Sequence, residues 1–191
     1  MLNKKINNYF LLLFCILPIS IIAGSSISLA NILLIDISFI VLILCRKDFD
    51  FLKSKTIKYF LILYLYLIFN SFISIDYEIG LARNLGFIRF IILFVAFNYF
   101  FEQKTFLKNT LLIWTLVITI ILCDVFYESY FDKNILGFGG DTYGDRIVSF
   151  FKDEPIVGGY IYSFYLIILG FLFYEFNQRK NLIILFSIIF L

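Results

Sequence analysis

The sequence predicts an all-α, polytopic transmembrane helical bundle with six complete spans and a truncated seventh. Hydrophobic residues make up 62% of the chain and charged residues only 16%, so one soluble core could not bury the apolar surface. Apolar runs of about 18 residues recur between short polar breaks, close to the roughly 20 residues that cross a bilayer. A soluble protein with long buried helices does not explain that recurrence.

Each expected span ends where charged or turn-forming residues interrupt the apolar run. The six complete spans cover residues 9–24, 27–45, 59–75, 84–101, 108–127 and 156–175. A seventh begins near Asn181 as NLIILFSIIFL, which is shorter than the roughly 20 residues needed to cross. We therefore expect a single transmembrane domain over residues 1–191, forming the N-terminal part of a longer protein.

The distribution of Lys and Arg predicts the orientation of this bundle. With the N-terminus in the cytoplasm, eleven of the 16 basic residues fall in inside segments. The remaining five lie outside or near the outer face: Arg83, Arg89, Lys133, Arg146 and Lys152. Because short cytoplasmic loops carry an excess of Lys and Arg, the sequence predicts a multi-pass protein with a cytoplasmic N-terminus.

The sequence offers no pattern for a metal site or a nucleotide loop. The chain has no histidine, and Cys15, Cys45 and Cys123 lie in or beside spans without CxxC spacing, so they read as small packing residues. The glycine-rich stretch GFGGDTYG lacks both the GK[ST] ending and the preceding strand of a phosphate loop. We expect no metal and no cofactor, and we interpret this stretch as part of a flexible exterior loop.

That exterior loop, from about residue 128 to 155, carries an unusual concentration of charge. It leads into DRIVSFFKDEPIVGGYI, residues 145–161. Pro155 suits the first turn of the next helix, where its missing N–H is no loss. Asp153 and Glu154 would favour the positive end of that helix dipole.

Two charges lie inside expected spans. Arg89 is about 8 Å below the outer end of its span and Asp36 about 13 Å below the outer end of its own, at 1.5 Å per residue. A charge at such depth costs at least about 2.5–3.5 kcal/mol on insertion scales. We expect Asp36 and Arg89 to pair or to form two walls of one outward-open cavity; alternatively, Arg89 snorkels and Asp36 hydrogen-bonds a neighbouring helix.

The outer cations suit an anionic lipid headgroup. Arg83, Arg89, Arg146 and Lys152 would face one membrane-level cavity, and the planar arginine fork matches phosphate oxygens. Arg83 and Arg89 are about 600° apart around a helix, so their convergence requires a loop or an unwound turn. The alternative is a solvated loop with scattered ion pairs.

The charged segment resembles a motif of the O-antigen ligase and polymerase family of bacterial envelope glycosyltransferases. That motif has an Arg, an aromatic residue, an acid followed by Pro or Asn, and small residues before Tyr or Leu at the start of a helix. The matching positions here are Arg146, Phe150, Phe151, Asp153, Glu154, Pro155, Gly158, Gly159 and Tyr160. The stretch LARNLGFIRFIILFVAFNYFF is also similar to the family's Arg-bearing span, through Arg83 and Arg89.

The resemblance implies a metal-free enzyme of the bacterial inner (plasma) membrane. It would transfer a glycan from undecaprenyl diphosphate, on the periplasmic side, to a hydroxyl of a growing glycan or of lipid A core. The partners are then this donor, the acceptor and membrane lipid, with no nucleic acid. The resemblance does not separate polymerase from ligase.

The same resemblance suggests roles for individual residues. Arg146 would bind the diphosphate with the help of Arg89. Asp153 and Glu154 would position the loop or act as the base. From the charge and depth arguments above, and not from the resemblance, we expect Lys152 and Asp36 to bind substrate, together with Arg83.

The chain departs from the family's pattern in one respect. The family's second large exterior loop, often with a His, is absent here, so we expect the 191-residue chain to be inactive alone.

The rival class is a transporter or flippase of polysaccharide precursors, for which interrupted spans and charges in both halves of the bilayer are expected. A small membrane protein with no catalytic role is the third possibility.

Overall fold

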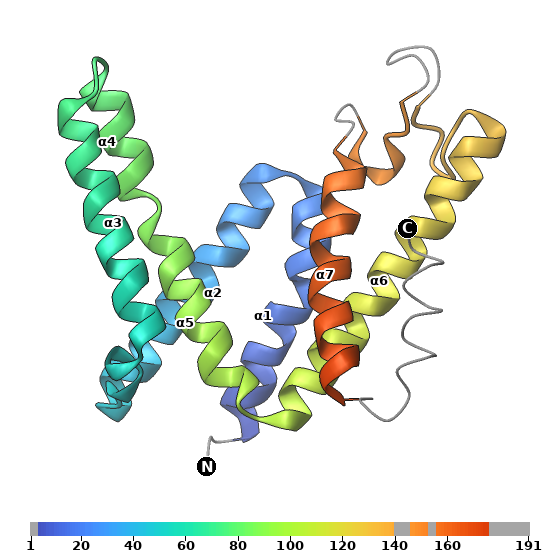
Figure 1. Ribbon diagram of the computed structural model, residues 1–191. Coiled ribbons are helices and arrows are strands. Elements are labelled where there is room, and N and C mark those ends of the chain that lie inside the picture. The colour runs from blue at the N-terminus through green and yellow to red at the C-terminus, as the bar shows by residue number, and fades with distance from the viewer. Residues whose placement is uncertain (1–3, 140–145, 153–155, 176–191) are drawn as a thin grey trace. The chain divides into compact units, whose positions relative to one another are not determined.

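The computed structural model describes residues 4–139, 146–152 and 156–175, with the side chains of Asp50, Tyr174 and Glu175 left out. Every regular element in these ranges is helical (Figure 1), as the sequence predicts. The elements are α1 (Lys4–Ala23), α2 (Ser25–Arg46), η1 (Asp50–Lys53), α3 (Lys55–Ile73), α4 (Tyr77–Leu85), α5 (Ile88–Phe101), α6 (Lys104–Phe131), η3 (Ser149–Phe151) and α7 (Val157–Glu175).

Five segments of the described chain are long and apolar enough to cross a membrane. They are α1, α2, α3, the combined stretch Tyr77–Phe101, and α6. The described apolar part of α7, Val157–Phe173, is shorter. The expected seventh span, near Asn181, lies outside the described residues. A multi-pass membrane protein therefore agrees with the length and composition of these helices.

Helix α6 is longer than the sequence suggested. The loop expected from about residue 128 begins instead at Asp132, because α6 continues to Phe131. The amide of Asp132 donates to the carbonyl of Glu128 at 2.8 Å, and Asp132 has a φ of 60°. A left-handed residue of this kind commonly ends a helix, so the true boundary follows Glu128 by one helical turn.

The described contacts group into two compact units. Unit 1 comprises Met1–Phe14 and Ser28–Leu107, and unit 2 comprises Cys15–Ile27 and Lys108–Leu191. The single transmembrane domain expected from the sequence stays a prediction.

An aromatic cluster forms the core of unit 1. The ring of Phe100 lies 4.3 Å from Phe10 and 5.1 Å from Phe106, measured between ring centroids. The ring of Phe14 meets Phe106 edge-on at 5.6 Å. All four side chains are almost fully buried, so the cluster joins α1 to α5 and to the first turn of α6 through large apolar contacts.

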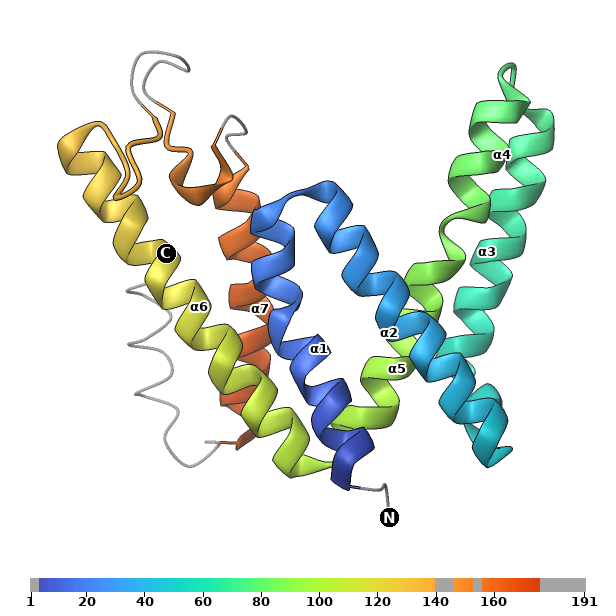
Figure 2. The ribbon, with the colours of Figure 1, turned by 180° about the vertical axis from the view of Figure 1, so that it is seen from behind.

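A polar contact fastens α4 to α3, which lie side by side in Figures 1 and 2. The Asn84 amide Nδ2 donates to the Leu67 carbonyl at 3.0 Å and to Ser71 Oγ at 2.6 Å. A Cβ at Gly80 would be 3.8 Å from the Ser71 side chain. Small residues and side-chain hydrogen bonds of this kind are how apolar helices associate without a hydrophobic driving force.

The fourth apolar segment is divided, whereas the sequence suggested one continuous span over residues 84–101. The first part, α4, begins earlier, at Tyr77, and ends at Leu85; α5 begins at Ile88. Between them, the amide of Phe87 donates to Asn84 O and that of Phe90 to Phe87 O, which are the tighter i→i+3 bonds of a 3₁₀ turn. Gly86, a poor helix former, lies at this break.

Candidate functional site

Two buried carboxylates lie on one face of α6 near its Phe131 end. Asp124 is fully buried and Glu128 is 4% exposed. Their spacing of four residues places them one above the other on the helix. Buried carboxylates are costly unless they are hydrogen-bonded, and both meet donors from the segment between α6 and α7.

Glu128 binds two consecutive backbone amides. Its Oε1 accepts from Val148 N at 3.0 Å and its Oε2 accepts from Ser149 N at 2.6 Å. Hydrogen bonds to a charged acceptor are stronger than neutral ones. This one side chain therefore holds the segment that precedes η3 against α6.

Asp124 and Asn134 complete the attachment of Ser149. Asp124 Oδ2 accepts from Ser149 Oγ at 2.5 Å and its Oδ1 accepts from Ile135 N at 3.0 Å. The amide of Asn134 donates to Ser149 O at 2.8 Å. The N–H, hydroxyl and carbonyl of Ser149 are thus all bonded, and we call Asp124, Glu128, Asn134 and Ser149 the loop latch.

The loop latch fixes the backbone that carries two exposed cations, Arg146 and Lys152. Arg146 lies two residues before Val148, and Lys152 directly follows η3; both side chains are exposed. Lys152 Nζ lies 6.0 Å from the centre of the Phe138 ring. With a φ of 58° at Lys152 and 48° at Ser149, the segment turns sharply on both sides of the buried Phe151.

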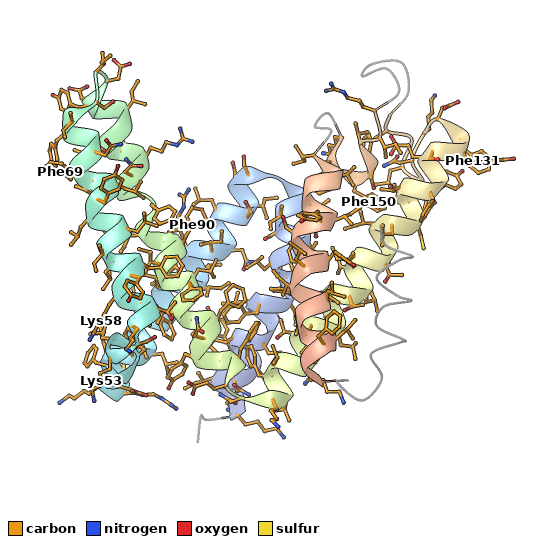
Figure 3. All side chains as sticks on the ribbon, viewed as in Figure 1. Lys53, Lys58, Phe69, Phe90, Phe131 and Phe150 are labelled. Atoms are coloured by element: carbon orange, nitrogen blue, oxygen red, sulfur yellow. The ribbon has the colours of Figure 1, made fainter. Side chains whose placement is uncertain are left out.

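An apolar groove of about 530 Å³ adjoins Lys152 in unit 2. Its walls come from the second half of α1, the middle of α6 and the residues between α6 and α7 that the loop latch holds. We call these residues the latched segment. The lining residues are Ile19, Ile22, Ala23, Val117, Ile120, Ile121, Leu136, Phe138, Phe150 and Lys152; Figure 3 labels Phe150. Lys152 is the one charged lining residue among them, so this Lys152 groove can take an apolar chain with an anionic end.

The other residues of the sequence motif divide between packing and open surface. Phe151 lies 5.1 Å from Tyr160 between ring centroids, and the Tyr160 hydroxyl donates to Pro18 O at 2.9 Å. These two aromatic residues therefore hold η3, α7 and α1 together. A Cβ at Gly158 or Gly159 would meet nothing within 4 Å, so no contact of the described residues requires glycine there.

The remaining predicted site residues lie in unit 1 or outside the described residues. Asp153 and Glu154 are among those not described, so their roles stay predictions. Arg83, exposed in the last turn of α4, and Arg89, half-buried in the first turn of α5, stand on the two sides of the helix break. Their expected convergence with Arg146 and Lys152, which belong to unit 2, also stays a prediction.

Asp36 and Arg89 are not hydrogen-bonded to each other. Asp36 is 3% exposed, and neither of its carboxylate oxygens has a hydrogen-bond partner; the same is true of Arg89 Nε. The Arg89 guanidinium lies 4.9 Å from the centre of the Phe90 ring. The direct-pair form of the hypothesis is therefore not seen, and the form in which the two residues line one cavity stays a prediction.

Sequence reasoning missed the loop latch. Asp124 and Glu128 were hidden by the apolar run 108–127 and by the expected loop start at residue 128. The available signal was a pair of acids four residues apart at the end of a span, since such acids normally have partners. Two glycines of the loop take part in this arrangement: Gly137 N donates to Asn134 O at 2.9 Å, and a Cβ at Gly139 would lie 2.6 Å from Glu128 Oε1.

Comparison with known proteins gives no family assignment. No protein-family model, no curated protein and no solved structure matches the chain. Within the described residues, no group of three or more His, Cys, Asp and Glu side chains is placed to hold a metal ion. The features that point to a function are therefore the loop latch, the Lys152 groove and the Arg146 motif.

Proposed function

We propose that the protein is a membrane glycosyltransferase that polymerises or ligates undecaprenyl-diphosphate-linked surface polysaccharide. The observation that carries this proposal is the Lys152 groove, whose lining is apolar except for Lys152. Part of its wall is the segment that the buried carboxylates of Asp124 and Glu128 hold in place. A polyprenyl chain with a diphosphate end has the matching chemistry. The resemblance of the Arg146 motif to O-antigen ligases and polymerases supports the same class.

In this proposal the protein lies in the bacterial inner membrane with six complete spans and a cytoplasmic N-terminus. The latched segment then faces the periplasm. The support for this orientation is the basic connection between α2 and α3, with Arg46, Lys47, Lys53, Lys55 and Lys58, which the positive-inside rule assigns to the cytoplasm. Span six would be α7.

The chemistry assigned to the site is displacement of a diphosphate. The acceptor hydroxyl oxygen forms a bond to the anomeric carbon as the bond from that carbon to the diphosphate oxygen breaks. Negative charge grows on the leaving diphosphate, and Arg146 and Lys152 would stabilise it. The acceptor proton passes to a general base, for which Asp153 and Glu154 are the proposed candidates. Arg89 and Arg83 would assist, and Asp36 would act on Arg89.

The experiment is a glycan profile from cells that depend on this gene for surface polysaccharide. Arg146→Lys keeps a positive charge but removes the planar fork that grips a diphosphate through two bonds. We expect polymer or ligated glycan to disappear from the gel while the protein level is unchanged. Lys133→Arg, on the same loop but outside both the groove lining and the Arg146 motif, is the control. Unaltered glycan in Arg146→Lys would contradict the assignment.

A second candidate function, transport or flipping of polysaccharide precursors, is favoured by one observation. The segment Tyr77–Phe101 is interrupted between Leu85 and Ile88 with an arginine on each side, and interrupted helices frame the binding sites of many transporters. Vesicles that contain the protein would separate the two functions. Accelerated lipid flipping without glycan transfer supports the transporter, and glycan transfer without flipping supports the enzyme.

A further inference from the structure

The exposed face of α6 changes its chemistry along the helix. Its large exposed apolar side chains nearer the start are all aliphatic: Leu112, Ile113, Leu116 and Ile120. Those in its last turns are all aromatic: Phe126, Tyr127, Tyr130 and Phe131. Tyrosines gather where a membrane meets water, whereas aliphatic side chains face the hydrocarbon core. The change therefore indicates that the Phe131 end of α6, labelled in Figure 3, lies at the level of the lipid headgroups.

The length of α6 agrees with this placement. Its 28 residues extend about 42 Å at 1.5 Å per residue. The hydrocarbon core of a bilayer is about 30 Å thick, and the bilayer with its headgroups about 40–45 Å. A helix that begins with Lys104 at one surface therefore reaches the headgroups of the opposite leaflet at Phe131. Two exposed charged residues, Asp132 and Lys133, follow directly.

The turn Asn134–Phe138 runs back along α6 instead of away from it. Ile135 N donates to Asp124 Oδ1 at 3.0 Å. Asp124 lies seven residues before Phe131, about 10 Å along the helix. Ile135 and Leu136 are nevertheless 62% and 63% exposed. Two apolar side chains are thus held open at a level where α6 is already inside the leaflet.

The backbone of this turn is hydrogen-bonded within the protein. In addition to the Ile135 amide, Asn134 N donates to Phe138 O at 2.8 Å and Gly137 N to Asn134 O at 2.9 Å. Asn134 Oδ1 accepts from Leu136 N at 3.0 Å and from Phe138 N at 2.7 Å. Every amide of the turn therefore has a protein acceptor. Non-helical backbone inside a membrane requires such internal partners, because no water is there to replace them.

We propose that the turn Asn134–Phe138 is inserted into the leaflet that surrounds the Phe131 end of α6. Ile135 and Leu136 lie among the acyl chains, and the tyrosines of α6 lie at the headgroups. The partner of this surface is membrane lipid, because the exposed aliphatic face of α6 points to lipid and the turn continues that apolar surface. The charged residues just before the turn stay at the membrane surface.

Insertion gives the Lys152 groove a side that opens to the leaflet. Leu136 and Phe138 belong to the inserted turn, and both line the groove. The apolar chain of a lipid can then enter the groove from the leaflet without crossing water. This consequence rests on the proposed function, whereas the insertion does not.

The test measures the depth of a nitroxide label on the whole chain in vesicles of phosphatidylcholine and phosphatidylglycerol. The native thiols are first removed by Cys15→Ala, Cys45→Ser and Cys123→Ser. Single cysteines are then placed at exposed positions: Leu136→Cys and Ile135→Cys in the turn, Leu116→Cys on the aliphatic face of α6, and Lys133→Cys just before the turn. Electron paramagnetic resonance compares collisions of each label with molecular oxygen, which concentrates in the bilayer, and with a water-soluble nickel complex.

We expect the Leu136→Cys label to collide more with oxygen than with nickel, as the Leu116→Cys label does. The Lys133→Cys label should show the reverse. Ile135→Cys repeats the measurement at a second position, because its latch bond comes from the backbone and survives the substitution. Labels in the turn that behave like the Lys133→Cys label would place the turn in water and overturn the proposal.

A label in the turn that is shielded from both reagents would also overturn it, because protein and not lipid would then cover the turn. None of these outcomes involves a glycan. A failed insertion therefore leaves the proposed glycan transfer standing, and a failed glycan transfer leaves the insertion standing.

Discussion

Replacement of Glu128 by Ala should release the segment that carries Arg146 and Lys152. The change removes the acceptor of two backbone amides, Val148 N and Ser149 N, both on residues that are fully buried. Each hydrogen bond to a charged group contributes about 1.5–3 kcal/mol, so the two together should cost about 3–6 kcal/mol of local stability. Glu128→Gln keeps one carbonyl acceptor and should lose about half as much.

Hydrogen exchange of individual amides measures this loss directly. A decrease of about 3–6 kcal/mol corresponds to exchange about 10²–10⁴ times faster at Val148 and Ser149. The amides in the middle of α3 should not change, because they belong to unit 1. Glu78→Ala, whose carboxylate accepts only from the Tyr77 hydroxyl among the contacts of the described residues, is the control. Unchanged exchange at Val148 and Ser149 in Glu128→Ala would refute the latch.

Two further substitutions test the packing around the latch. Gly139→Ala places a Cβ 2.6 Å from Glu128 Oε1 at a φ of +97°, so it should cost about 2–5 kcal/mol from backbone strain and a lost hydrogen bond. Gly137→Ala, at a φ of +84° with nothing within 4 Å, should lose stability only through backbone strain. Chemical unfolding that gives the same loss of stability for both variants would contradict the clash at Gly139. Tyr160→Phe should lower stability by about 0.5–1.5 kcal/mol through loss of its bond to Pro18 O. Tyr162→Phe, at an exposed position, should leave the stability unchanged. Equal unfolding temperatures for the two variants in detergent would show that the Tyr160 hydrogen bond does not stabilise the protein.

The helices were predictable because apolar runs and their polar breaks are local features of the sequence. The expected spans 27–45 and 59–75 correspond to α2 and α3 within a few residues. The break between α4 and α5 was not predicted, because the fourth span was read as one helix from residue 84. The sequence does carry a signal for it, since α4 contains the polar residues Glu78, Arg83 and Asn84 whereas α5 is almost wholly apolar. The long α6 was misjudged because Glu128 was read as a loop charge, whereas it is buried.

The candidate site was predictable only in part. Arg146 and Lys152 stood out because charge is rare in this chain, and the structure gives Lys152 a place beside an apolar groove. Asn134 and Ser149 could not have been found, since their role depends on contacts between residues 15 to 25 positions apart in the sequence. The depth argument for Asp36 correctly marked a buried carboxyl group, although it could not tell whether that group is hydrogen-bonded.

The most direct test of the central claim is the affinity of the purified chain for undecaprenyl diphosphate in detergent. The proposed function predicts that Arg146→Ala and Lys152→Ala each weaken binding by about ten-fold or more, in line with the loss of a charge-assisted hydrogen bond. Lys133→Ala, on the same loop but outside both the Lys152 groove and the Arg146 motif, should bind as the unaltered chain does. Equal affinity in all four proteins would contradict the assignment of the latched segment as the diphosphate site.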